Sequence, residues 1–180
     1  MRAIIAVSAA LDRAARWGAA IGFTAMLVFV AIQVVARYIF DSPPIWTEEL
    51  ARYAMVWAGL LGAACAFRAG VDPVLVRRAA IPGRGVGHLL RLLRAAAALI
   101  FVLPVLYYCL FGAGADPSRG YIARAAAKTA DTLGFPMIWV AAAVPVALAL
   151  IVIHILAFLA AGRDSYEAEQ VEAASRESKP

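Results

Sequence analysis

The chain has 180 residues, of which 64% are hydrophobic and 16% are charged, and its mean hydropathy is +0.80. This composition excludes an ordinary soluble domain, and the apolar residues fall in long blocks, which is typical of an integral membrane protein. The net charge of +5 comes from arginines that flank these blocks without a recognisable nucleic-acid-binding module, so we expect no nucleic acid partner.

Four apolar segments are long enough to cross a bilayer, at about residues 17–36, 47–67, 95–115 and 133–161. Because backbone polar groups must find their hydrogen bonds inside the hydrocarbon, such segments predict helices. We therefore expect an all-α integral membrane protein. Residues 1–162 form a single four-helix domain in this prediction, and residues 163–180 form a polar cytoplasmic tail.

The first segment has a basic start and an apolar run, as a secretory signal peptide does. Its run is twenty residues long and no small-x-small cleavage site follows, so we expect a retained span. It carries Gly18 and Gly22 at an interval of four. The second segment repeats small residues at the same interval, at Ala54, Ala58, Gly62 and Ala66, which predicts a face that packs closely on another helix.

The second segment also carries an acidic pair at its head. The uncharged part, Tyr53 to Phe67, has fifteen residues and is about 22 Å long, which is short for a hydrocarbon core of about 30 Å. Extending the span backwards draws Glu48, Glu49 and Arg52 into the outer edge of the membrane, where unpaired charge is unfavourable.

Two interpretations of this charged group remain open. In the first, Tyr38, Trp46 and Tyr53 form an interfacial aromatic belt, the charges reach water, and Arg52 neutralises the acidic pair. In the second, Glu48 or Glu49 is kept for a cationic group on a partner.

The loop between the second and third spans has its own pattern. Asp72 and Pro73 are placed to start a helix whose Arg77 and Arg78 can reach lipid headgroups, so we expect a short amphipathic interfacial helix that contacts membrane lipid. After a Pro-Gly break, basic residues recur at helical spacing up to Arg94, so the third span is expected to begin as an amphipathic stalk.

Lys and Arg are distributed unevenly around the spans. Twelve lie on the side of the amino terminus and five on the opposite side. The positive-inside rule then places both termini in the cytoplasm.

Residues suited to catalysis are not grouped. Cys65 and Cys109 are isolated and at different depths, so they do not form the Cys-x-x-Cys pair of a thiol oxidoreductase. His88 and His154 do not share the common depth that paired haem ligands need. We expect no enzyme activity, no cofactor and no metal, and we keep a membrane-embedded redox or quinone protein as the rival interpretation.

Three motifs carry a family resemblance: R-Y-I-F from Arg37, W-T-E-E-L-A-R-Y from Trp46, and L-L-G-A-A-C-A-F-R-A-G from Leu60. A fourth motif, T-L-G-F-P-M-I-W, precedes Pro145. With these motifs, the chain from about residue 10 to 160 resembles the small, DctQ-like membrane subunit of TRAP (tripartite ATP-independent periplasmic) transporters. The sequence departs from the family pattern at Val71, where a His often follows the Gly.

The resemblance implies a secondary importer in the bacterial inner membrane. Its other parts would be a large multi-span permease subunit and a periplasmic solute-binding protein, and this chain would be the scaffold in sodium-coupled uptake of an organic acid. The small subunit of another tripartite carboxylate importer is the nearest alternative. The candidate partner-contact or structural residues are Arg37, Tyr38, Trp46, Glu48, Glu49, Arg52, Ala58, Gly62 and Arg68.

Overall fold

The computed structural model describes residues 2–69 and 84–160. In chain order the elements are α1 (Arg2–Ile39), α2 (Ile45–Ala69), α3 (Arg84–Leu110), η2 (Pro117–Arg119), α4 (Tyr121–Ala126), α5 (Ile138–Ala141) and α6 (Ala143–Ala160).

Four helical stretches in this part of the chain are long and apolar enough to cross a membrane: Ala3–Ile39, Ile45–Ala69, Leu92–Leu110 and Ile138–Ala160. The expected all-α membrane fold with four spanning helices is thereby confirmed. The expected interfacial helix at residues 72–79 and the polar tail at 163–180 lie outside the described residues.

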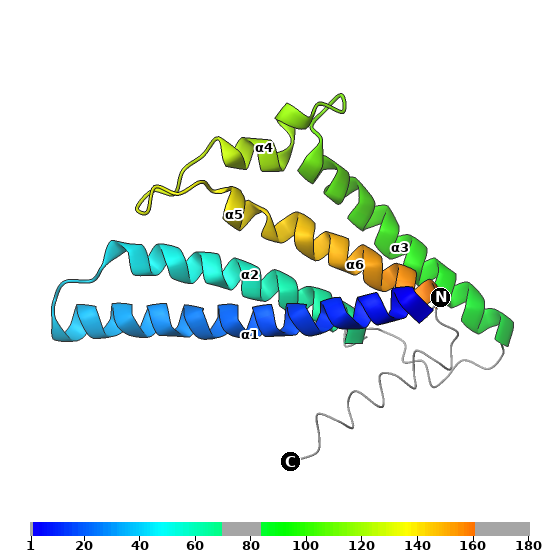
Figure 1. Cartoon of the computed structure of the whole chain (residues 1–180), viewed down its shortest axis with the longest axis horizontal. Coiled ribbons are helices and arrows are strands. Elements are labelled where there is room, and N and C mark those ends of the chain that lie inside the picture. The colour runs from blue at the N-terminus through cyan, green and yellow to red at the C-terminus, as the bar shows by residue number, and fades with distance from the viewer. Residues whose placement is uncertain (1, 70–83, 161–180) are drawn as a thin grey trace, which may run out of the picture.

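The helices are arranged as a fan with α6 at its centre (Figure 1). Helices α1 and α2 run side by side, and α6 packs on both of them. Helix α3 packs on the opposite side of α6, and it leans away from α1 and α2. The ends of the fan therefore differ: the carboxyl end of α6 lies close to the start of α1, whereas the loops at the other end are spread apart.

Helix α1 is longer than the expected span. It has 38 residues, or about 57 Å, which is nearly twice the thickness of the hydrocarbon core. The helix begins at Arg2 rather than near residue 17, because Ser8, Asp12 and Ala15 are buried against neighbouring helices and extend the packing beyond the apolar run. The amino-terminal half of α1 is thus part of the folded bundle.

Close packing of α1 on α2 depends on glycine. A Cβ at Gly22 would lie 3.3 Å from both the Ala54 carbonyl oxygen and Ala58 Cβ, and one at Gly18 would lie 2.8 Å from Leu61 Cδ1. The two backbones approach closely because these side chains are small or absent. By contrast, a Cβ at Gly62 would meet no atom within 4 Å.

Helix α3 ends at Leu110 and not near residue 115 as expected. The chain turns there because the Gly112 backbone packs directly on Arg119, leaving no room for a side chain. Gly114 and Ala115 then adopt positive φ values of 79° and 60°, which a right-handed helix does not contain.

The last span also begins later than expected. Residues 133–137 belong to a loop in which Gly134 has a φ of 66°, and the helix starts at Ile138. The helix assignment is interrupted at Ala142, although the backbone there stays in the right-handed helical region, with a φ of −60° and a ψ of −21°. Pro145 has no N–H to donate to the carbonyl of Ala141, so the helix is divided into α5 and α6 at this point.

Candidate functional site

Glu49 is buried near the start of α2, with 3% of its surface exposed. One carboxylate oxygen, Oε1, accepts hydrogen bonds from the Tyr53 hydroxyl and from the backbone N–H of Asp131, the latter at 3.0 Å. The other oxygen accepts from the backbone N–H of Thr132 at 3.0 Å. A carboxylate removed from water needs such donors, and here all of them come from the chain itself.

The loop at residues 128–137 supplies the two backbone donors. Its arms are held together by Ala130 N–H donating to the Phe135 carbonyl at 2.8 Å and Met137 N–H donating to the Lys128 carbonyl at 2.9 Å. Gly134, at positive φ, allows the reversal of the chain between the arms. The N–H groups at the tip are left without partners in the loop, and Glu49 accepts their hydrogen bonds.

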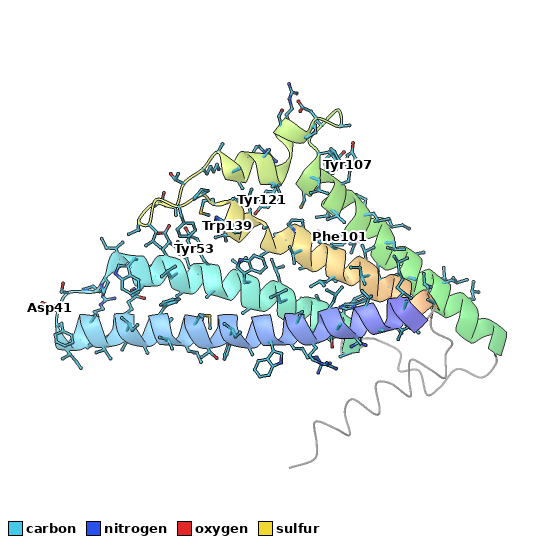
Figure 2. The ribbon with its side chains drawn as sticks, in the orientation of Figure 1. Asp41, Tyr53, Phe101, Tyr107, Tyr121 and Trp139 are labelled. Carbon is cyan, nitrogen blue, oxygen red and sulfur yellow. The ribbon has the colours of Figure 1, made fainter. Side chains whose placement is uncertain are left out.

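Aromatic side chains strengthen this junction between α2 and the 128–137 loop. The Tyr53 hydroxyl lies 3.3 Å from Met137 Sδ, and the Tyr53 ring meets Phe135 edge to face at a centroid distance of 5.6 Å. One turn further along α2, Trp57 Nε1 donates to the Trp139 carbonyl at 3.1 Å. Figure 2 shows Tyr53 and Trp139 at this end of the bundle.

A second buried carboxylate, Asp12 on α1, lies at the other end of α2. It is 3% exposed, and its Oδ2 lies 2.9 Å from Arg68 Nη1 and 3.0 Å from Arg16 Nε. The Cys65 thiol lies 3.8 Å from the Asp12 carbonyl oxygen. These contacts join the end of α2 to α1 by charge-assisted hydrogen bonds, which are the stronger kind.

Next to this ion pair, a polar contact joins α1 to α6. Ser8 Oγ lies 2.8 Å from Nδ1 of His154, and each residue is only 1% exposed. Within residues 2–69 and 84–160, Nε2 of His154 has no hydrogen-bond partner. His154 is thus a packed residue in the bundle.

The remaining candidate residues lie apart from these two junctions. Arg37, Glu48 and Arg52 are exposed, as is Tyr38 at 80%. Trp46 packs edge to face on Phe29 of α1, Ala58 lies at the α1 contact, and Gly62 is half-buried.

The carboxylate of Glu49 is held by backbone N–H groups and Tyr53. The expected charge pairing with Arg52 is not among its hydrogen bonds.

Two kinds of residue in these junctions were not predicted from the sequence. Asp12 was not singled out, although an acidic residue four positions before Arg16 on an apolar helix is a signal for a local ion pair. The backbone donors of Asp131 and Thr132 have no such signal, because any residue in a turn can supply an N–H.

Comparison with known proteins gives two matches. The family described as "Tripartite ATP-independent periplasmic transporters, DctQ component" matches residues 26–163. The chain is also similar to the "Sialic acid TRAP transporter permease protein SiaT" of Haemophilus influenzae (strain 86-028NP), with 34% identity over 58 residues. The aligned stretch covers 32% of this chain but only 9% of that relative, so the chain spans a small part of its length.

Proposed function

Because the chain belongs to the DctQ component family of the tripartite ATP-independent periplasmic transporters, we propose that it is the scaffold subunit of a TRAP importer. Its partners are a large multi-span permease subunit and a periplasmic solute-binding protein in the bacterial inner membrane. The transported solute is an organic acid, taken up with sodium. Similarity to a sialic acid permease protein supports the acidic class of solute.

The main support for the scaffold role is that the two buried carboxylates form contacts between elements of this chain. Glu49 fastens α2 to the 128–137 loop, and Asp12 fastens α1 to the far end of α2. A transport pathway needs polar groups that can exchange partners with a solute or an ion. Here both oxygens of Glu49 and one oxygen of Asp12 contact groups of this chain, at opposite ends of one helix, which favours a rigid body.

The surface of the bundle supports a role beside a larger membrane partner. Only 6% of the residues in the most apolar stretch of α1 are buried, against 33% in the last span. Large side chains such as Trp17 and Ile21 are 68% and 66% exposed. In a membrane such a face contacts either lipid or another apolar helix, so α1 has ample surface for the permease subunit.

Orientation follows from the charge distribution. We place both termini in the cytoplasm, because the excess of arginine lies on their side of the spans. The Glu49 junction and the 128–137 loop then face the periplasm. Exposed Arg37, Glu48 and Arg52 lie at the same end of α1 and α2 and are available to partner chains.

Co-purification tests the proposal. The tagged chain is expressed in its own host, extracted in mild detergent, and the accompanying chains are identified by mass spectrometry. We expect a stoichiometric large permease subunit. Recovery of the chain alone would contradict the proposal, provided that the permease is expressed and the detergent preserves known membrane complexes.

A further inference from the structure

A hollow lies just beyond the end of α3, outside both junctions described above. Its volume is about 470 Å³, within the range of about 300–1,000 Å³ that small-molecule sites occupy. The residues that line it come from the end of α3, the following turn, η2 and α4: Tyr108, Gly112, Ala113, Ser118, Arg119 and Arg124.

The backbone around this hollow is tightly folded. Gly112 N–H donates to the Asp116 carbonyl at 2.9 Å, and a side chain at Gly120 would overlap the Leu110 carbonyl. The Asp116 carboxylate accepts from the Ser118 N–H at 2.9 Å and from the Ser118 hydroxyl at 2.7 Å. These contacts fix η2 against the end of α3, so the backbone that surrounds the hollow is held in place.

The charge in the hollow is positive. Arg119 Nε lies 3.3 Å from Asp116 Oδ2, but the Arg119 side chain is 72% exposed and keeps its other donors available. The hydrogen bonds from Ser118 hold the pKa of Asp116 below its ordinary value, so this carboxylate is charged and partly neutralises Arg119. Arg124 has no ion pair with any residue in 2–69 or 84–160, and its charge is left uncompensated there.

The chain position of the hollow puts it at a membrane boundary. The apolar stretch of α3 ends at Leu110, and the hollow begins with Tyr108 and Gly112. Tyr107 packs on Tyr108 and Phe111 at centroid distances of 5.4 and 5.3 Å, and Figure 2 shows Tyr107 at this end of α3. Clusters of tyrosine are typical of the depth at which lipid headgroups lie.

We propose that this hollow binds the headgroup of an anionic phospholipid, with Arg119 and Arg124 contacting the phosphate. Guanidinium groups bind phosphate oxygens in a paired geometry, and exposed Tyr108 lies where the headgroup meets the acyl chains. The lipid is preferred to a soluble anion because the hollow adjoins the apolar end of a spanning helix. The site is independent of the transporter partnership proposed above.

Native mass spectrometry of the full chain in mild detergent tests this proposal. Phosphatidylglycerol, phosphatidylcholine or inorganic phosphate is added in separate titrations. We expect retained phosphatidylglycerol, and a roughly 25-fold weaker retention in R119Q/R124Q, taking about a factor of five for each basic residue near an anionic lipid. The R119K/R124K variant should keep most of the binding.

A variant of equal charge change, R37Q/R52Q, is the matched control, because both arginines are exposed and lie away from the hollow. Equal loss of phosphatidylglycerol in the two glutamine variants would overturn the site. Saturation by inorganic phosphate alone, or equal retention of phosphatidylcholine, would overturn the anionic lipid as its ligand.

Discussion

Replacing Glu49 by Gln should release the 128–137 loop from α2. The carboxylate accepts three hydrogen bonds, from the Tyr53 hydroxyl and the N–H groups of Asp131 and Thr132. Glutamine keeps one oxygen acceptor and presents a donor in place of the other, so at least one N–H then faces a donor. Hydrogen bonds to charged groups contribute about 1.5–3 kcal/mol each, which gives an expected loss of about 2 kcal/mol for the docked loop.

Amide hydrogen exchange measures this loss directly. Since about 1.4 kcal/mol corresponds to a factor of ten, a loss of about 2 kcal/mol increases the population of the undocked loop about 30-fold. We expect the amides of Asp131 and Thr132 in E49Q to exchange faster by about this factor, with α6 unchanged.

The neighbouring variant E48Q provides a matched control. Glu48 is exposed and is the residue next to Glu49, so this substitution makes the same change of charge at the same end of α2 without touching the loop. Exchange in the 128–137 loop should match the wild type. If E49Q and E48Q exchange alike, Glu49 does not hold the loop and the reasoning from its contacts is refuted.

Other consequences follow from the remaining contacts. Asp12→Asn and Arg68→Gln should each lower the free energy of unfolding in detergent by about 3 kcal/mol, because each leaves the opposite charge with fewer partners. The double variant should lose less stability than the sum of the two single variants, and additive losses would contradict a direct pair. Gly22→Leu should separate α1 from α2 and lower the melting temperature, whereas Gly62→Ala, which adds a Cβ in open space, should leave it nearly unchanged. The hydrogen bonds from Ser118 hold the pKa of Asp116 below its ordinary value, so its stabilising effect should be present above the ordinary titration range of aspartate and be lost only as the pH falls below that range. A carboxyl carbon shift that titrates at or above the ordinary midpoint of aspartate would refute this.

The sequence predicted the helices because their signal is local. A block of about twenty apolar residues has few stable forms other than a membrane helix. Each of the four blocks forms a helix that is long and apolar enough to cross a membrane. Small residues at an interval of four also indicated where α1 and α2 could approach, and Gly22 does meet Ala54 and Ala58. Gly62 shows the limit of this pattern, because a Cβ there would meet no atom within 4 Å, although α1 and α2 still contact each other at Leu61 and at the Asp12–Arg68 pair.

The partners of the buried charges could not be predicted in the same way. Two of the three donors to Glu49, the N–H groups of Asp131 and Thr132, come from more than eighty positions away, and because they are backbone groups no side chain in the sequence marks them. The end of the third span depended on a similar contact, because Gly112 packs on the Arg119 backbone. Helix ends set by tertiary contact need the fold before they can be placed.

A cross-link between α1 and α2 tests most directly whether this chain is, as we propose, a rigid scaffold beside the permease subunit. In a chain whose native Cys65 and Cys109 are replaced by Ala, G22C/A58C introduces a pair for which the Cβ–Cβ separation is 3.3 Å, close to the roughly 3.5–4.5 Å of disulfides.

The assembled transporter carrying this pair is then assayed for uptake of the solute that co-purifies with its binding protein, before and after oxidation. The scaffold account predicts equal uptake in the oxidised and reduced states, within about a factor of two. Loss of uptake on oxidation, restored by a reductant and absent from the cysteine-free control, would show that α1 and α2 move during transport and would contradict the account.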